Sequence, residues 1–350
     1  MLDEFIRAMP KVELHVHMEG SIRPETFLTL AQRHGVPLPG DTVDALREWY
    51  NFTEFAHFIT VYKTIASCLR TPDDVELIAR EFLTNQAEQN IIYSEVTYTP
   101  YIQFKNCGIG VREQLEAINR ARAWAERELH VSMNLIIDIP RQVSATEGLI
   151  VAGWAIDGMS DGVIGFGLAG LEAGHPAEKH KEAFDRARSA GLRSVPHAGE
   201  LAGPESIRSA LRLLGAERIG HGITCLQDPD LVAELRDRQI PLEVCPTSNV
   251  CLKVAPSMDE HPLPHLIDSG LFVTLNSDDP PLFNTSLTGE CLIAAKTFGF
   301  DREQIQELSL NSVRAAFLPE DQRRSLEERF RVEMGNLTAT LPYDKVRNMQ

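Results

Sequence analysis

The stretch GVIGFGLA at residues 162–169 contains only apolar side chains and glycine. A strand with one face in water alternates apolar and polar side chains, whereas a strand that is buried on both faces is apolar throughout. Strands of the second kind are typical of parallel sheets that helices cover on the outside. The stretch therefore predicts a buried strand in the wall of an α/β protein.

Seven other short apolar stretches repeat this pattern along the chain. The eight expected strands are 11–15, 91–98, 131–138, 162–169, 192–197, 218–221, 241–245 and 271–276. Amphipathic helical patterns separate many of them, at 23–35, 111–129, 180–191, 204–215 and 228–239. Because strands that alternate with helices form a parallel sheet, and eight strands can close it, we predict a (β/α)₈ TIM-type barrel. The interval 16–90 has several helical patterns, which indicates extra helices over the barrel mouth.

No linker or repeat divides the chain, so we expect one barrel domain over residues 1–335 and a C-terminal tail over 336–350. The net charge of −16, from 50 acidic and 34 basic residues, argues against nucleic acid and anionic membranes as partners. There is no apolar stretch of membrane-spanning length and no signal-peptide pattern. The six cysteines form no CxxC pair, which indicates reduced thiols in a cytoplasmic protein. The oligomeric state stays open.

Histidine and aspartate residues stand where four of these strands end or lead into loops. They are His15 and His17 after the first strand, His197 after the fifth, His221 after the sixth, and Asp278 and Asp279 after the eighth. Each of them alone is also explained by a turn or by a hydrogen-bonded core position. In a TIM barrel, however, the carboxyl ends of the strands share one rim, and active sites lie there. Their common position favours a functional site over separate structural roles.

The segment ELHVHMEG at 13–20 adds a metal to this interpretation. Alternate residues of a strand share a face, so the side chains of His15 and His17 are expected to point the same way. Together with His197 and Asp278 they suit Zn²⁺ and leave a position for water, whose pKa a bound Zn²⁺ lowers from about 16 toward about 7. The fourth strand ends in Leu-Ala-Gly, without the lysine that binuclear barrel hydrolases often carry there. This favours one metal per chain.

Three further residues have chemistry that suits such a site. Glu200 follows His197 by three residues, close enough to shuttle protons without being a ligand. His221 and Asp279 can orient the attacking water or hold a substrate nitrogen, although Asp279 must be protonated to donate a hydrogen bond. His175, just past the fourth strand, stays open as a site candidate.

The segments HVHMEG, LAG, HAGE, GHG and NSDDP, in this order at the strand ends, resemble the motifs of the adenosine/adenine deaminase family of the amidohydrolase superfamily. The resemblance spans nearly the whole chain, from residue 11 to 319, and the five motifs together are highly specific. It implies a hydrolase of cyclic amidines that removes ammonia from a 6-aminopurine nucleoside. It also implies that one Zn²⁺ is bound by His15, His17, His197 and Asp278.

The resemblance further assigns a role to each of the remaining site residues. Glu200 would protonate purine N1, His221 would activate and hold the hydroxide, Asp279 would bond to N7, and the backbone N–H of Gly170 would bond to N3. The HVHMEG motif places His17 and Glu19 beside the substrate. Phe52, Phe55 and Ile59 match, more loosely, an apolar helix that closes over the base, with a place in the helix core as the alternative.

Two departures from the family pattern leave the substrate open. Glu19 stands where adenosine-specific members have an aspartate that bonds to the ribose 5′-hydroxyl, and LAGLEAGHP stands where they have LAGDE. Glu19 and EAGHP (172–176) favour free adenine or a 5′-modified nucleoside, whereas Gly170 and GPESI (203–207) favour a nucleoside. Related bacterial proteins act on aminodeoxyfutalosine in menaquinone synthesis, so this nucleoside is an alternative. A barrel hydrolase of another ring or ester, and a non-catalytic binding protein, are the two other hypotheses, and Glu200 argues against the second.

Overall fold

The computed structural model of the protein describes residues 1–52 and 54–341. Eight strands form one sheet in chain order, and every neighbouring pair is parallel. The strands are β1 (Lys11–His17), β2 (Ile91–Tyr98), β3 (Ser132–Pro140), β4 (Val163–Ala169), β5 (Arg193–Ala198), β6 (Ile219–His221), β7 (Leu242–Val244) and β8 (Val273–Leu275). A parallel bridge between Val16 and Asp278 joins β1 to the segment after β8 and closes the barrel.

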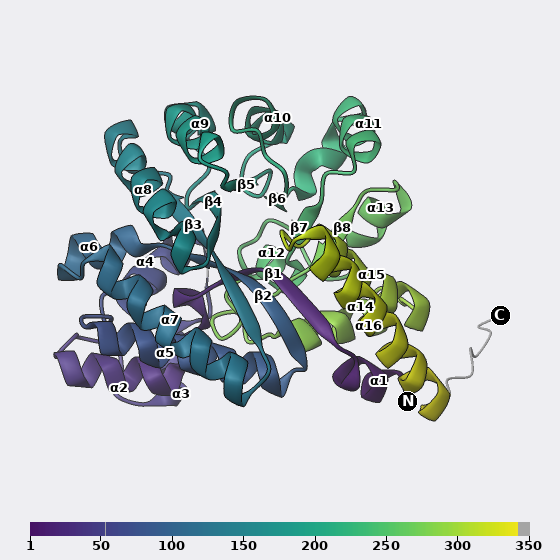
Figure 1. The fold of residues 1–350 in the computed structure, drawn as a ribbon, viewed down its shortest axis with the longest axis horizontal. Coiled ribbons are helices and arrows are strands. Elements are labelled where there is room, and N and C mark those ends of the chain that lie inside the picture. Colours follow the sequence, from purple (N-terminus) through teal and green to yellow (C-terminus); the bar gives the residue numbers. More distant parts are fainter. Residues whose placement is uncertain (53, 342–350) are drawn as a thin grey trace.

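Helices surround the strands on the outside of the barrel (Figure 1). The α-helices are α1 (Leu2–Ala8), α2 (Pro24–His34), α3 (Val43–Trp49), α4 (Phe55–Ala66), α5 (Pro72–Glu88), α6 (Pro100–Cys107), α7 (Val111–Glu128), α8 (Ala145–Asp157), α9 (Lys181–Ser189), α10 (Pro204–Leu213), α11 (Pro229–Arg238), α12 (Pro246–Cys251), α13 (Leu263–Asp268), α14 (Leu287–Lys296), α15 (Arg302–Ala315) and α16 (Glu320–Thr340). Short 3₁₀ helices are η1 (Glu19–Ser21), η2 (Gly158–Asp161), η3 (Ala177–His180) and η4 (Ile223–Gln227).

This architecture confirms the predicted (β/α)₈ barrel. Each strand lies on the stretch that the sequence predicts, and β2 has the predicted bounds. The strand that decided the prediction, β4, is buried over most of its length, with Phe166 and Leu168 fully buried. Helices α2 to α5 fill the interval between β1 and β2, and α4 contributes to the wall of the cavity described below.

A buried ion network supports the site from inside the barrel. Arg218 is fully buried, and its guanidinium group lies 2.6 Å from Glu95 Oε2 and 2.6 Å from Glu243 Oε1. The second oxygen of Glu243 lies 2.8 Å from Nδ1 of His15. A buried charge is tolerated only when it is paired and hydrogen-bonded, so these contacts hold Glu243, and through it the His15 ring, in one position.

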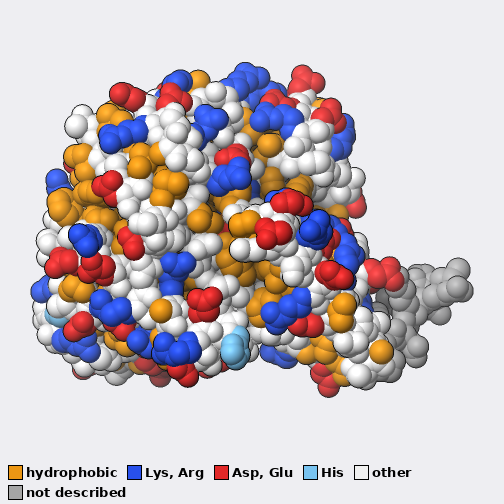
Figure 2. Space-filling view, viewed as in Figure 1, with side chains coloured by type: hydrophobic (Ala, Val, Ile, Leu, Met, Phe, Trp, Pro, Cys, Tyr) orange, Lys and Arg blue, Asp and Glu red, His pale blue; other side chains and the backbone are white. Residues whose placement is uncertain are grey.

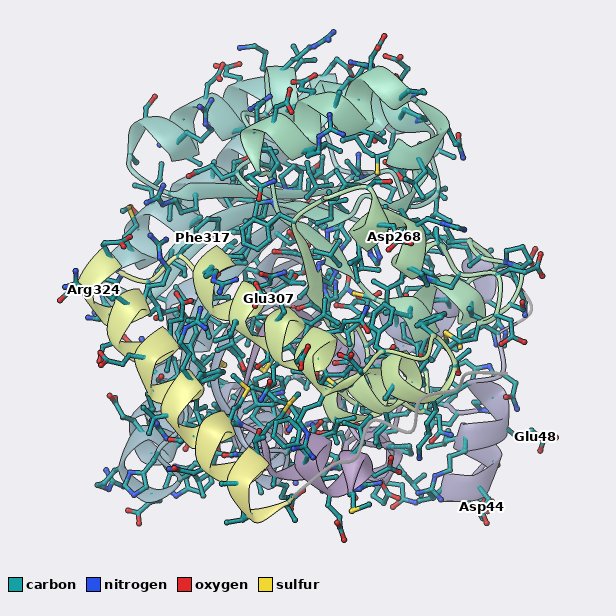
Figure 3. All side chains as sticks on the ribbon, turned by 90° about the vertical axis from the view of Figure 1, so that its right-hand side faces the viewer. Asp44, Glu48, Asp268, Glu307, Phe317 and Arg324 are labelled. Carbon is teal, nitrogen blue, oxygen red and sulfur yellow. The ribbon has the colours of Figure 1, made fainter. Side chains whose placement is uncertain are left out.

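The last helix extends past the predicted start of the tail. Helix α16 continues through Asn336 to Thr340, because Phe330, Met334 and Leu337 pack against the core beside α1 and α15. Figure 3 shows α16, with Arg324 labelled near its start, next to α15 with Glu307. The boundary at 335/336 therefore falls inside a helix, and residues 342–350 of the predicted tail lie outside the described residues.

Acidic and basic side chains are intermixed on the face shown in Figure 2. Among the described residues, no helix is both long enough and apolar enough to cross a membrane.

Candidate active site

The predicted rim residues meet at one cavity of about 450 Å³ at the carboxyl ends of the strands. The predicted residues that line it are His17, Gly170, His197, Glu200, His221, Asp278 and Asp279. Phe55 and Ile59 of α4 also line it, so this helix covers the mouth, whereas Phe52 packs against Phe58 and Phe283. The chain thus gathers most of the predicted residues, which are far apart in the sequence, around one space.

Four ligand atoms converge at the inner end of this cavity. Nε2 of His17 lies 3.2 Å from Nε2 of His197 and 3.2 Å from Oδ1 of Asp278. Nε2 of His15 lies 3.5 Å from the same Asp278 oxygen. Tetrahedral Zn²⁺ with bonds of about 2.0–2.1 Å places its ligand atoms roughly 3.3 Å apart. These three separations fit a single small cation held by these side chains.

The protonation pattern of His15 also fits a metal ligand. Its Nδ1 lies 2.8 Å from Glu243, while its Nε2 has no hydrogen-bond partner in the part of the chain that the structure describes. When Nδ1–H donates to Glu243, Nε2 keeps its lone pair for a cation. Burial alone lowers the pKa of His15, but the neighbouring carboxylates of Asp278 and Glu243 outweigh it and raise the pKa to about 10. A cation must displace that proton in order to bind.

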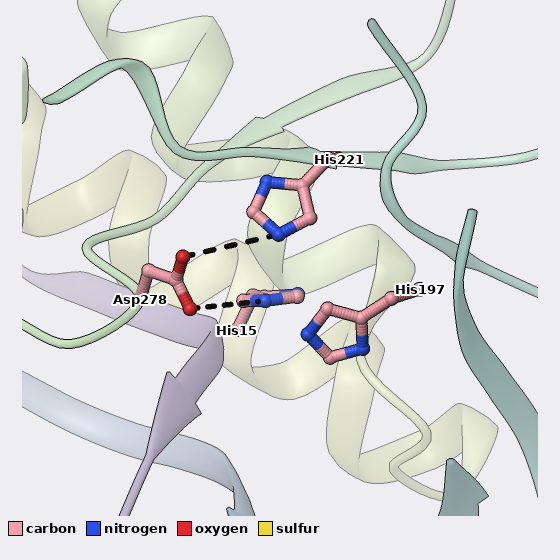
Figure 4. Close-up of side chains that lie close together, drawn as sticks. All are labelled: His15, His197, His221 and Asp278. Carbon is pink, nitrogen blue, oxygen red and sulfur yellow. Dashed lines mark ion pairs between the residues drawn. The ribbon is translucent and has the colours of Figure 1, made fainter. Parts of the chain in front are cut away.

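His221 is the alternative fourth ligand. Its ligand atom lies within 4.8 Å of those of His15, His197 and Asp278. Figure 4 shows these four side chains gathered together. However, its Nε2 lies 3.8 Å from Oδ2 of Asp278, farther than the 3.2 Å between His17 and Oδ1. The shorter distances favour His17 as the ligand.

A chain of side chains fixes the orientation and proton position of His221. The amide nitrogen of Asn249 lies 3.2 Å from Nδ1 of His221, and the amide oxygen of Asn249 lies 3.1 Å from Nε2 of His261. Because an amide nitrogen can only donate, Nδ1 of His221 is the acceptor and its Nε2 carries the proton. Nε2 of His221 lies 3.7 Å from Oε1 of Glu200, and both residues line the cavity. Burial lowers the pKa of His221 to about 3, which keeps the ring neutral.

Burial favours the protonated form of two carboxyl groups in the cavity. Burial, together with the charges of Asp278 and Glu172, raises the pKa of Glu200 to about 8. Burial and the adjacent Asp278 charge raise the pKa of Asp279 well above its usual value. In the protonated form both groups can donate hydrogen bonds or protons.

Glu172 holds the loop that carries Glu200. Its side-chain oxygens accept backbone N–H bonds from Gly199 at 2.8 Å, Glu200 at 3.1 Å, Leu201 at 2.8 Å and Ala202 at 2.9 Å. It also accepts the hydroxyl of Ser206. Sequence reasoning considered the EAGHP segment only in relation to the substrate and missed this role. The segment after β4 thus positions the acid that follows β5.

We expect Glu172→Gln to lower kcat by roughly 10- to 100-fold, because displacement of a catalytic group by about 1 Å can cost that much. In the wild type the backbone N–H groups of this loop donate to the carboxylate oxygens of Glu172. Glutamine replaces one of these acceptor oxygens with an NH₂ group, which cannot accept. Steady-state kinetics over a range of pH measures the effect, since a displaced Glu200 also shifts the pH profile. Glu182→Gln, on the exposed face of α9, is the matched control. Wild-type kinetics in Glu172→Gln would show that the loop holds its position without the carboxylate.

Gly20 of the HVHMEG motif is required by close approach to Asp279. A Cβ atom at Gly20 would lie 1.5 Å from Oδ1 of Asp279, so any side chain here must push that carboxyl group away. We expect Gly20→Ala to lower kcat/KM by about 10-fold or more, because the Asp279 carboxyl group must turn away and its Cβ, 2.8 Å from the added atom, must shift as well. Gly335→Ala in α16 is the control, since a Cβ there meets nothing within 4 Å. Circular dichroism and kinetics on both variants check this, and an unchanged kcat/KM in Gly20→Ala would contradict it.

Two predicted candidates lie away from the cavity wall. Glu19 is fully buried and accepts hydrogen bonds from the Thr99 backbone N–H at 3.1 Å and from the Tyr62 hydroxyl at 3.3 Å. Tyr62 lines the cavity and Glu19 lies behind it. His175 is likewise outside the lining, and its carbonyl oxygen accepts a hydrogen bond from Arg141.

A family model described as adenosine deaminase matches residues 10–332. The chain belongs to the adenosine deaminase family. As a member of this family the protein is a hydrolase that acts on C–N bonds, which confirms the resemblance seen in the five motifs.

Individual members of the adenosine deaminase family are similar over nearly the whole chain. An aminodeoxyfutalosine deaminase from Streptomyces avermitilis is 43% identical, with 91% of this chain and 89% of the relative covered. An adenine deaminase from Rhodopseudomonas palustris is 37% identical over 93% of this chain and 94% of the relative. The crystal structure of an amidohydrolase from Burkhoderia ambifaria with bound Zn is 29% identical, with a TM-score of 0.91 over 98% of this chain and 95% of that one.

Proposed function

We propose that the protein is a zinc-dependent aminohydrolase that removes the 6-amino group of an aminopurine nucleoside. The observation that carries the proposal is the arrangement of one four-ligand cluster and two buried carboxyl groups, Glu200 and Asp279, around a single cavity. Burial raises the pKa of both carboxyl groups and so favours their proton-donating form. The zinc in the similar amidohydrolase structure supports Zn²⁺ as the cation. We propose one ion per chain, because the ligand atoms enclose one position.

Bound by His15, His17, His197 and Asp278, the ion would supply a water molecule of lowered pKa. Glu200 donates its proton to N1 of the purine, which makes C6 more electrophilic. Asp279 donates a hydrogen bond to N7, and the backbone N–H of Gly170, in a left-handed conformation with φ of 100°, bonds to N3. The Nε2–H of His221 orients the attacking oxygen. Each of these groups therefore donates, and together they recognise the acceptor nitrogens of an aminopurine.

Two relatives support aminodeoxyfutalosine and adenine as candidate substrates. The 43% identity to an aminodeoxyfutalosine deaminase favours that 5′-extended nucleoside. The 37% identity to an adenine deaminase favours the free base as a second candidate. The cavity of about 450 Å³ lies within the range of about 300–1,000 Å³ that holds drug-sized ligands, which favours a nucleoside over a bare purine.

A side-by-side comparison of rates tests the proposed function. The zinc-loaded protein is mixed with adenosine, deoxyadenosine, adenine and aminodeoxyfutalosine, and ammonia release is followed with the change in purine absorbance. We expect deamination of at least one nucleoside faster than of adenine. If none of the four releases ammonia, the aminopurine assignment is wrong, and lactones, hydantoins and pterins are the next substrates to test.

A further inference from the structure

Charged side chains that line the cavity are sorted by sign along its depth. The three acidic residues in the lining, Glu200, Asp278 and Asp279, all belong to the inner cluster. The two lysines in the lining, Lys63 and Lys105, come from α4 and α6, the helices at the mouth. The chain as a whole has 50 acidic and 34 basic residues. The outer end of the cavity differs from this average, because the described residues that line it include lysines and no acidic residue. The cavity has an acidic floor and a basic rim.

Neither lysine is fully neutralised by the protein. Lys63 is exposed, and no ion pair to it is found among the described residues. Lys105 lies 3.7 Å from Oε1 of Glu147 and 6.0 Å from the centre of the Tyr101 ring. That ion pair is long and Lys105 is 62% exposed, so its ammonium group can turn toward a ligand. Positive charge is therefore available at the rim to a ligand.

The proposed orientation of the base directs its sugar toward this rim. Glu200, Asp279 and the Gly170 N–H are assigned to N1, N7 and N3, so N9, which carries the sugar, is left to face the rest of the cavity. Glu19 occupies the sequence position at which adenosine-specific members of the family carry an aspartate for the 5′-hydroxyl. Its carboxylate is held by Thr99 and Tyr62 behind the cavity wall, so it does not face the sugar. The 5′ side of a bound nucleoside meets lysines instead of an acid.

We propose that Lys63 and Lys105 form a subsite for an anionic group, a carboxylate or a phosphate, carried on the 5′ side of the nucleoside. Tyr101 and Ile102, on the same helix as Lys105, also line the cavity and provide apolar surface there. The inference rests on the proposed function, because it takes its orientation from the aminopurine contacts. It makes charge at the 5′ end, and not only its size, a determinant of specificity.

The test combines turnover with binding. Values of kcat/KM for adenosine, adenosine 5′-monophosphate and aminodeoxyfutalosine are compared in the wild type and in the double variant Lys63→Gln/Lys105→Gln, with Lys181→Gln on α9 as the control. Lys181 is exposed and pairs with Asp185. We expect the wild type to prefer an anionic substrate and the double variant to lose that preference by about 10-fold, because each exposed charge pair contributes up to about fivefold. The substrate whose preference is lost distinguishes carboxylate from phosphate.

Calorimetric affinities for inosine and inosine 5′-monophosphate, at two salt concentrations, provide a readout that does not depend on turnover. Tighter, salt-sensitive binding of an anionic ligand that weakens only in the lysine variant supports the subsite. The subsite is overturned if the ratio of kcat/KM and the ratio of affinity for anionic over neutral ligands are both the same in the wild type and the double variant. Deamination of adenosine in that case still supports the proposed function. Failure of every purine to react or bind overturns both.

Discussion

Replacing Glu200 with glutamine is expected to lower kcat by about 10²- to 10⁴-fold, the usual contribution of a general acid or base. Burial and the charges of Asp278 and Glu172 raise the pKa of Glu200 to about 8, so at neutral pH its carboxyl group holds a transferable proton. Glutamine keeps the shape and can donate a hydrogen bond, but it cannot release a proton to N1. The variant should therefore bind substrate nearly as well and fail in the chemical step, which steady-state and single-turnover kinetics separate.

Glu205→Gln is the matched control, because Glu205 follows the same loop at the start of α10 and its side chain is 87% exposed. Its kinetics should equal those of the wild type. Metal content of both variants is measured, so that a loss of zinc is not mistaken for a loss of acid catalysis. Wild-type turnover in a zinc-loaded Glu200→Gln protein would mean that another group protonates the substrate.

The barrel could be predicted because its determinants are local. A strand such as β4 must be apolar throughout since helices cover one face and the barrel interior the other, and this is visible in eight consecutive letters of the sequence. The rim residues could be predicted for the same reason, because parallel strands bring their carboxyl ends together whatever the sequence between them. Position along the chain was enough to place His15, His197 and Asp278 in one cluster.

The groups that hold the rim residues in place could not be predicted in this way. Glu172 bonds to four backbone N–H groups of residues 199–202, and a backbone N–H has no sequence signature. Glu243 reaches His15 across more than two hundred residues, and it is oriented by Arg218, which directly precedes the neighbouring strand β6. A charged residue in a strand is visible in the sequence, but its partner depends on register and on side-chain direction, which only the folded barrel fixes.

The backbone conformation of two site residues also depends on contacts that the sequence does not reveal. His221 and Asp278 have φ values of 60° and 64°, in the left-handed region that non-glycine residues rarely adopt. Each costs on the order of 1 kcal/mol, so the surrounding contacts must impose it. For Asp278 these contacts include backbone bonds to both His15 and His17, at 3.1 Å and 2.9 Å. The closure of the barrel between β1 and the segment after β8 thus sets the position of a ligand.

We expect Asp278→Asn to lose the bound metal and at least about 100-fold of kcat/KM, because even outer-shell changes cost 10- to 100-fold in metal affinity or activity. The substitution removes the negative charge that lies within 3.5 Å of both His15 and His17, and it also removes a charge that raises the pKa of Glu200 and of Asp279. Zinc per chain is measured by mass spectrometry before and after addition of excess zinc, alongside kinetics. Asp268→Asn, at the exposed end of α13, is the control with the same chemical change. Should Asp278→Asn keep one zinc per chain and wild-type turnover, the cation must be held by a different set of side chains, and the metal assignment made here is wrong.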